Sequence, residues 1–359
     1  MSSHIEFVDT RSAPQETLEG LHELHLLQED EVLPGDPPFP WQQRLLDWRH
    51  PLETERLDHW VLWKGPEIVA TSGLHVDLVE NLENAYGWVY VHPQHRGSGY
   101  GRAIATPMLD AAEADGRIRF AVGIKDGRPE EALARRAGMK SAYREKVSRL
   151  DFQALDWDLM ESWMTRSAER AFDYELMLLQ SPIEDEYVDA FCDLMFVMNS
   201  APREDFVEDE ETMTPEIWRD LELKMALTGR EILIYVARHK PTGNFAGFTT
   251  VAHKPLQPDL VDQWDTGVDP DHRNKGIGRW VKAAMAFELR NRYPRVTRID
   301  TENAGSNAPM LDINVEMGFK PILIQNVWQG DLAAIRANLG ICDRAVLTRA
   351  SALLSIAGR

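Results

Sequence analysis

The sequence predicts an α/β protein built from two similar domains in tandem. The chain has 359 residues, which is long for a single domain. One order of strand-like and helix-like segments occurs twice along it. A glycine-rich turn between a strand and a helix also stands at the same place in each half, at 96–101 and at 273–278.

The first half, residues 1–151, is expected to form one domain. Alternating β-branched and aromatic residues predict strands, and apolar residues at a spacing of about 3.6 predict helices. The predicted helices cover 16–31, 101–114 and 129–138, and the predicted strands cover 59–64, 67–78, 86–93, 117–124 and 142–151.

Residues 152–180 are expected to form a linker helix and an opening strand, followed by a second domain at 181–330. Its predicted helices cover 184–199, 215–229, 278–291 and 307–318, and its predicted strands cover 231–239, 244–253, 260–270, 295–303 and 320–328. The tail, 331–359, has no counterpart in the first half. Three interpretations stay open for this tail: it docks on the rest of the chain, it takes part in dimerisation, or it is a segment foreign to the fold.

Composition limits the classes of partner. Asp and Glu number 58 against 39 Lys and Arg, a formal charge of −19, which repels nucleic acid and anionic membranes and suits a cationic partner. Acidity that serves only solubility is the alternative. Cys192 and Cys342 stand far apart without a Cys/His cluster, so no disulfide framework and no metal site is expected. With neither an export signal nor a membrane span predicted, the expected location is the cytoplasm.

The two glycine-rich turns have the chemistry of a pyrophosphate cradle. Glycines allow backbone N–H groups to converge on an anion, and the N-terminus of the following helix adds partial positive charge. The spacing is neither that of a P-loop nor that of a dinucleotide-binding strand-turn-helix. The first turn comprises Arg96, Gly97, Ser98, Gly99, Tyr100 and Gly101, and the second comprises Arg273, Asn274, Lys275, Gly276, Ile277 and Gly278.

Both turns match V-x-P-x-x-R-x-x-G-x-G, and the second half adds 303-NAGSNAPMLDINVEMGF-319. In these motifs the chain resembles the GNAT (GCN5-related N-acetyltransferase) superfamily, and its layout is similar to mycothiol synthase-like two-domain actinobacterial acetyltransferases. The resemblance implies two tandem GNAT-like domains, each a mixed, mostly antiparallel sheet flanked by helices. The central strands of each sheet would splay apart, 86–92 from 117–124 and 260–268 from 295–303.

The resemblance also implies acetyl-CoA, or another acyl-CoA, as co-substrate. Its pantetheine arm would lie between the splayed strands. The backbone amide of Val268 would face the thioester carbonyl, as would that of Val91 in the first half. Asn303 and Asn307 match family asparagines that hold the arm, and Asn307 also has the position of a helix N-cap.

The catalytic residues are expected in the second half. Asp262 stands where many relatives carry an acidic residue, and it is the first candidate for the base. Asp265 is the second candidate, placed on the opposite face of the strand by alternation. Surface carboxylates at a strand start are the alternative for both. Asn314 replaces the tyrosine that often protonates the leaving thiolate, which puts that step in doubt. Either Asn314 binds sulfur or water as a catalytic residue, or the thiolate leaves unprotonated.

The first half has Ala85 and Ala134 at the positions of Asp262 and Asn314. We therefore expect a degenerate first domain that keeps its CoA loop and a catalytic second domain.

The expected function is N-acetyltransfer to a primary amine of a cationic small molecule. A non-catalytic CoA-binding module and an acetyltransferase acting on a protein amine are the alternatives, and the chain is a monomer or a homodimer. The acidic run 204–211 is either a solvated mobile loop or part of the acceptor site. Phe206, Trp218 and Trp264 are either cleft-lining or core residues.

Overall fold

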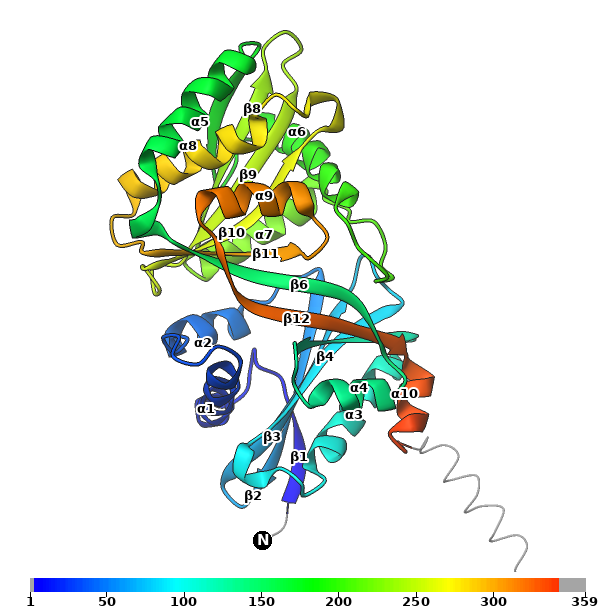
Figure 1. Ribbon diagram of the computed structural model, residues 1–359. Coiled ribbons are helices and arrows are strands. Elements are labelled where there is room, and N and C mark those ends of the chain that lie inside the picture. The colour runs from blue at the N-terminus through cyan, green and yellow to red at the C-terminus, as the bar shows by residue number, and fades with distance from the viewer. Residues whose placement is uncertain (1–2, 342–359) are drawn as a thin grey trace, which may run out of the picture.

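The computed structural model describes residues 3–341 and folds the chain into alternating strands and helices in two similar halves (Figure 1). The elements of the first half are β1 Ser3–Val8, α1 Gln15–Val32, α2 Trp41–Arg49, β2 Glu55–Lys64, β3 Glu67–Asp77, β4 Asn84–Val91, α3 Tyr100–Ala114, β5 Arg119–Lys125, α4 Glu130–Arg136 and β6 Lys140–Asp151. The predicted α/β class with two similar halves is confirmed.

The second half repeats this order after a linker helix. Its elements are α5 Trp157–Arg170, β7 Tyr174–Gln180, α6 Asp185–Met195, α7 Pro215–Leu227, β8 Glu231–His239, β9 Phe245–His253, β10 Leu260–Val268, α8 Ile277–Arg292, β11 Arg298–Ala304, α9 Ala308–Met317, β12 Lys320–Asp331 and α10 Leu332–Asn338. Each helix and strand expected from the sequence has a counterpart within a few residues. β1 and α2 had not been expected.

The twelve strands within residues 3–341 form one continuous sheet, in the order β1-β2-β3-β4-β5-β12-β6-β11-β10-β9-β8-β7. The two halves exchange their last strands. β6 leaves the first half and pairs antiparallel with β11, from Arg298↔Asp151 to Ala304↔Glu145. β12 returns from the second half and pairs with β5, and β6 and β12 also pair with each other at the centre of the sheet. A division of the chain at 151 and 330 therefore assigns these strands by sequence order and not by sheet partner.

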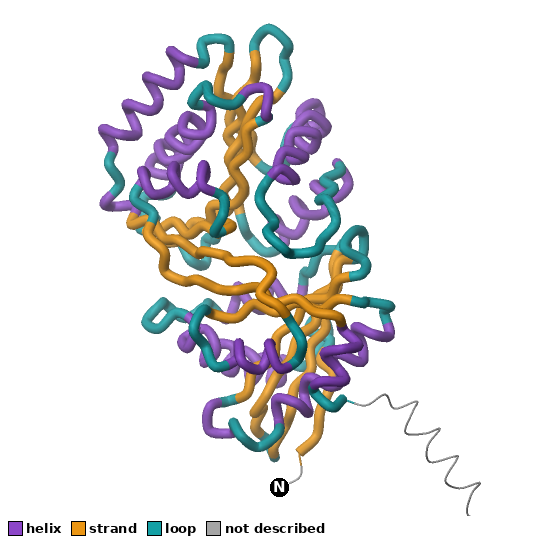
Figure 2. Tube along the Cα trace, turned by 45° about the vertical axis from the view of Figure 1, so that its right-hand side comes forward, coloured by secondary structure: helices purple, strands orange, loops and turns teal. Residues whose placement is uncertain are grey.

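Helices cover both faces of each half (Figures 1 and 2). In the second half, α5, α8 and α9 lie on one face, and α6 and α7 lie on the other. Apolar side chains of α5 and α8 pack on the sheet in one core cluster, and those of α6 and α7 form a separate cluster with Phe248. The first half likewise has α3 and α4 on one face and α1 and α2 on the other.

The central parallel strands of each half separate, as the resemblance implied. β4 pairs with β5 only from Asn84↔Arg119 to Tyr86↔Ala121. β10 pairs with β11 only from Leu260↔Arg298 to Gln263↔Thr301. Beyond these points each pair leaves a gap that opens toward its glycine-rich turn.

The start of the tail docks on the first half. Leu332 and Ile335 of α10, with Ile341 after it, are buried in the core cluster that contains α3. Arg336 forms ion pairs with Asp110 at 2.7 Å and Glu113 at 3.3 Å. Residues 342–359, including Cys342, lie outside the described part. No helix within 3–341 is both long and apolar enough to cross a lipid bilayer.

The exchanged strand β12 should couple the stabilities of the two halves. Trp328 on β12 is 4 % exposed and packs in the core of the first half. Trp328→Ala should lower the free energy of unfolding by about 3–5 kcal/mol, because it leaves a cavity in that core. Urea titration followed by tryptophan fluorescence and by circular dichroism measures this loss.

A single transition is expected in both probes, because each half contains a strand of the other. Val315→Ala, at a site 68 % exposed, is the matched control and should change little. Two separate transitions in the Trp328→Ala variant would contradict the coupling.

Candidate functional site

The two glycine-rich turns share one backbone geometry. Gly97 and Asn274 have φ of +78° and +64°, and Gly99 and Gly276 have φ of +80° and +86°. This left-handed region is open to glycine and tolerated by asparagine. α3 begins directly after Gly99 and α8 directly after Gly276, so each turn presents its amides at a helix N-terminus.

The strand before each turn directs one peptide into the gap. The Asp269 N–H donates to the Ala246 carbonyl of β9 at 2.9 Å. Because successive amides of a strand alternate in direction, the Val268 amide points away from β9 and into the gap toward β11. The Val268 carbonyl accepts from Arg273 Nε at 3.0 Å.

The first half repeats this pattern. The His92 N–H donates to the Val69 carbonyl at 2.9 Å, and the Val91 carbonyl accepts from Arg96 Nε at 3.1 Å. Each gap therefore carries one strand amide free to bind an oxygen, at Val91 and at Val268.

The arginines of the two turns differ in their other partners. Arg96 Nη2 contacts both carboxylate oxygens of Glu31, at 2.9 and 2.8 Å, so its charge is neutralised within the protein. Arg273 Nη2 donates instead to the Ser200 hydroxyl at 2.9 Å, a neutral partner. The second turn therefore keeps more positive charge available to a phosphate than the first.

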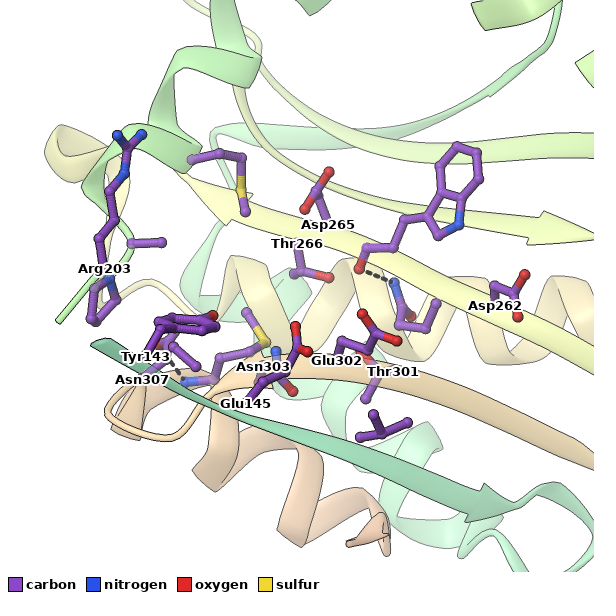
Figure 3. A pocket seen from close by; sticks show the side chains of 18 of the residues that line it. Tyr143, Glu145, Arg203, Asp262, Asp265, Thr266, Thr301, Glu302, Asn303 and Asn307 are labelled. Carbon is purple, nitrogen blue, oxygen red and sulfur yellow. Dashed lines mark hydrogen bonds between the residues drawn. The ribbon is translucent and has the colours of Figure 1, made fainter. Parts of the chain in front are cut away.

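A cavity of about 790 Å³ opens beside the second gap, between the two halves. Figure 3 shows side chains of β10, β11 and β6 converging on it. Its lining combines carboxylates, aromatic rings and asparagines: Tyr86, Tyr143, Glu145, Val147, Met198, Ala201, Pro202, Arg203, Phe206, Glu208, Glu211, Lys254, Asp262, Gln263, Trp264, Asp265, Thr266, Lys282, Asp300, Thr301, Glu302, Asn303, Ala304, Asn307, Met310 and Val327.

A β-bulge on β10 determines which of its side chains share a face of the sheet beside this cavity. Gln263 pairs with Val251 and Thr266 pairs with Thr249, so three steps on β10 match two on β9. Gln263 and Thr266 therefore share a face, and Asp262 and Asp265, one residue before each, share the other. The expectation that Asp265 lies on the opposite face from Asp262 is wrong, because the bulge breaks the alternation.

Asp262 and Asp265 differ in their environments. Asp262 forms an ion pair with Lys254 at 2.5 Å. Asp265 has no ion-pair partner within the described residues, and burial, with a smaller effect of the nearby Glu211, raises its pKa to about 6. Asp265 is therefore the better proton acceptor near neutral pH.

Glu302 on β11 is a further carboxylate of the cavity, and the sequence-based expectations had omitted it. It opens onto the cavity across the gap from Asp265 (Figure 3). Desolvation by the walls, with the neighbouring carboxylates Glu145, Asp262 and Asp300, raises the pKa of Glu302 to about 7. The alternation of 299-IDTE-302, with Ile299 and Thr301 buried and Glu302 open to the cavity, is the signal that could have found it.

The asparagines predicted to hold a pantetheine arm lie together on the face covered by α8 and α9. Asn314 Nδ2 donates to Asn303 Oδ1 at 2.7 Å, while the buried Asn314 Oδ1 has no hydrogen-bond partner in the described part of the chain. Asn307 caps α9, with its Oδ1 accepting from the Met310 N–H at 3.4 Å, and it also lines the cavity.

The corresponding place in the first half is filled by an indole. Trp88 stands three residues before Val91, as Asp265 stands three before Val268. It packs directly on Gly73 of β3, where an added Cβ would lie 2.0 Å from the ring. His59 lies beside it, with ring centroids 5.5 Å apart. β4 also pairs with β3 without a register shift, so the first half lacks the bulge. It also lacks the carboxylates, because Ala85 and Trp88 stand at the positions of Asp262 and Asp265.

The acidic run 204–211 is held against the first half. The Val207 carbonyl accepts from Asn84 Nδ2 at 2.9 Å and from Gln329 Nε2 at 3.0 Å. The Asp209 N–H donates to Asn81 Oδ1 at 2.7 Å. The run therefore forms part of the cavity wall, with Phe206, Glu208 and Glu211 in its lining, while most of its side chains are exposed to solvent.

Of the other two aromatics, Trp264 also lines the cavity, whereas Trp218 is 2 % exposed and belongs to the core.

Comparisons with known proteins agree with this geometry. The model of the Acetyltransferase (GNAT) family matches twice, at 19–139 and 195–319. A tandem GNAT protein from the clavulanic acid biosynthesis pathway superposes with a TM-score of 0.74 at 22 % identity, covering 92 % of this chain and 99 % of that one. A GCN5-related N-acetyltransferase from Sphaerobacter thermophilus gives 0.63 at 14 % identity, covering 91 % and 96 %. Curated proteins give no match in sequence.

Proposed function

Because the chain belongs to the Acetyltransferase (GNAT) family, a family of acyl-CoA-dependent transferases, we propose that it acetylates a primary amine of a cationic small molecule. The observation that carries this proposal is the second gap. On one side lie the turn 273–278 and the Val268 amide, and on the other lies an acidic, aromatic cavity. A CoA thioester and an amine would meet there from opposite faces of the sheet.

The residues of the second half fit the co-substrate. The turn amides and Arg273 would bind the pyrophosphate, and Asn303 and Asn307 would contact the pantetheine arm. The Val268 N–H points into the gap, where it would donate to the thioester oxygen as negative charge develops on it. This donor is fixed by the strand, so it needs no rearrangement during the reaction.

Asp265 is the proposed base, ahead of Asp262. An attacking ammonium must first lose a proton, and a carboxylate whose pKa lies near 6 accepts one more readily than an ion-paired carboxylate. Glu302 faces the same space and would hold the cationic acceptor beside the base. Together with Glu211 and Glu145 it gives this part of the cavity a negative potential.

The aromatic wall favours a small molecule over a protein acceptor. Tyr86 and Tyr143 lie with ring centroids 6.3 and 6.5 Å from that of Phe206, and all three line the cavity. Such rings bind apolar or cationic parts of a ligand. Because Tyr86 and Tyr143 belong to the first half, we propose that this half serves acceptor binding.

The proposed function is tested by a thiol-release assay with acetyl-CoA against a panel of diamines, aminosugars and peptides. Release of CoASH above the hydrolysis rate is expected with a cationic small amine, and mass spectrometry should find the acetylated product. Activity on peptides alone would point to a protein acceptor. Tight CoA binding without acetylated product from any amine would favour a non-catalytic CoA-binding module.

The two turns should contribute unequally to catalysis. Gly276→Trp should abolish turnover, because its left-handed backbone and the adjacent Ser167 leave no room for a side chain. Gly99→Trp, the matched change in the first half, should leave most turnover intact. Steady-state kinetics and calorimetric titration with CoA measure both effects. The assignment of catalysis to the second half fails if only Gly99→Trp is inactive.

Removal of the proposed base should cost far more than removal of its neighbour. Asp265→Asn should lower kcat by about 100-fold or more, whereas Asp262→Asn should cost less. In the wild type, kcat/KM should rise with pH through about 6, because Asp265 must lose its proton before it can accept one. The variant should lose this rise, and a profile unchanged by Asp265→Asn would contradict the assignment.

A further inference from the structure

Lys282 of α8 is a buried lysine for which the family motifs offer no role. Its exposed fraction is 2 %, and it has no ion pair or hydrogen bond to any residue of the described chain. The Lys282 Nζ lies 5.9 Å from the centroid of the Phe319 ring. Lysines are seldom buried without a partner because the charged form is poorly solvated there.

The side chain of Lys282 reaches the cavity from the face opposite the carboxylates. Val261 packs against α8, and Gln263 shares its face of β10. Lys282 lines the cavity with Gln263 and Thr301, the last residues that β10 and β11 pair before they separate. Lys282 therefore reaches the cavity from the α8 side, whereas Asp265 and Glu302 lie on the α6 and α7 side.

Lys282 also lies about one helical turn beyond the Val268 amide, which is the proposed donor to the thioester oxygen. It follows Gly278 by four residues, which is about one turn, or roughly 5–6 Å, along α8. Gly278 adjoins Val268, whose amide points into the gap. One turn further along the helix brings Lys282 level with the bulge of β10, where Asp265 stands on the other face.

Acetyl transfer requires two proton movements, and the proposed base Asp265 performs the first of them. The amine gives a proton to a carboxylate and forms a C–N bond to the acetyl carbon. The C–S bond then breaks, its electron pair goes to sulfur, and the thiolate takes up a proton. The position from which a tyrosine often donates this proton holds Asn314, whose amide is a poor acid.

We propose that Lys282 gives this second proton, passing it from its ammonium to the CoA sulfur as the thioester breaks. The proposal rests on acetyl transfer as the function. Burial lowers the pKa of Lys282 to about 7, so its ammonium is acidic enough to donate near neutral pH and its amine can be reprotonated from the solvent. Before it donates, the ammonium also stabilises the departing thiolate.

The test uses Lys282→Met, which keeps the length and apolar character of the stem and removes the charge. The full-length protein is loaded with CoASH, and the ultraviolet absorbance of the thiolate is followed against pH. In the wild type the bound thiol should deprotonate about one to three units below the free thiol value near 8.5, because a cation lies beside it. In Lys282→Met it should deprotonate at the free value or above.

Desulfo-CoA, which lacks the sulfur, separates this role from a structural one. It should bind equally tightly to the wild type and to Lys282→Met. Weaker desulfo-CoA binding by Lys282→Met, or an equal thiol pKa in both proteins, would overturn the proposal. Lys240→Met serves as the matched control, because Lys240 is exposed and its ammonium donates to the carbonyl of Phe172 far from the cavity lining.

Turnover supplies the second readout. Lys282→Met should lower kcat about 100-fold and leave the KM for acetyl-CoA unchanged, because the lost group acts only as the bond breaks. A raised KM with unchanged kcat would contradict a role in proton transfer. If the wild type acetylates no amine, the proposed function fails, and the thiol titration still decides whether Lys282 contacts the sulfur.

Discussion

The exchange of β6 and β12 between the halves is the constraint on which the rest of the structure depends. Each strand completes the sheet of the other half, and their mutual pairing joins two sheets into one. β6 brings Glu145 and Val147 to the edge of β11, and β12 brings Val327 to the same cavity. The cavity is therefore composite, and neither half can form it alone.

Within this common sheet, one inserted residue on β10 distinguishes the side chains that line the second gap from those of the first. Alternation places Asp262 and Trp264 on the amine-binding side of β10, and the bulge brings Asp265 to the same side, while Gln263 and Thr266 stay on the side of α8. β4 lacks the bulge and places Trp88 on Gly73, which closes the equivalent space. Both gaps keep a strand amide that points into them, at Val91 and Val268. The two halves therefore differ more where the amine would bind than where CoA would bind.

The sequence was most informative where short-range backbone geometry determines the structure. The turns 96–101 and 273–278 were predicted because left-handed positions require glycine or asparagine, and the strand and helix beside them have clear periodicity. β1 and α2 were missed because their own patterns are weak. α2 depends on distant packing, with Trp41 and Trp48 against His22 and His25 of α1.

Features set by long-range pairing could not be predicted. Nothing in the strand pattern of 320–331 indicates that β12 pairs with β5 of the other half, because any open edge could accept it. The common face of Asp262 and Asp265 depends on a bulge that alternation does not reveal. Glu302 and Lys282 look like ordinary surface residues until β11 and α8 are placed around the gap.

The exchange of strands also determines the order in which the two halves can complete their folding during synthesis on the ribosome. After residues 1–151 have emerged, β5 still has an open edge and Trp328 is missing from the core that contains α3. That edge stays unpaired until β12 emerges, about half the length of the chain later. The first half is therefore synthesised first but completes its sheet last. A nascent chain that stops before residue 320 carries an exposed strand edge that can pair with another molecule.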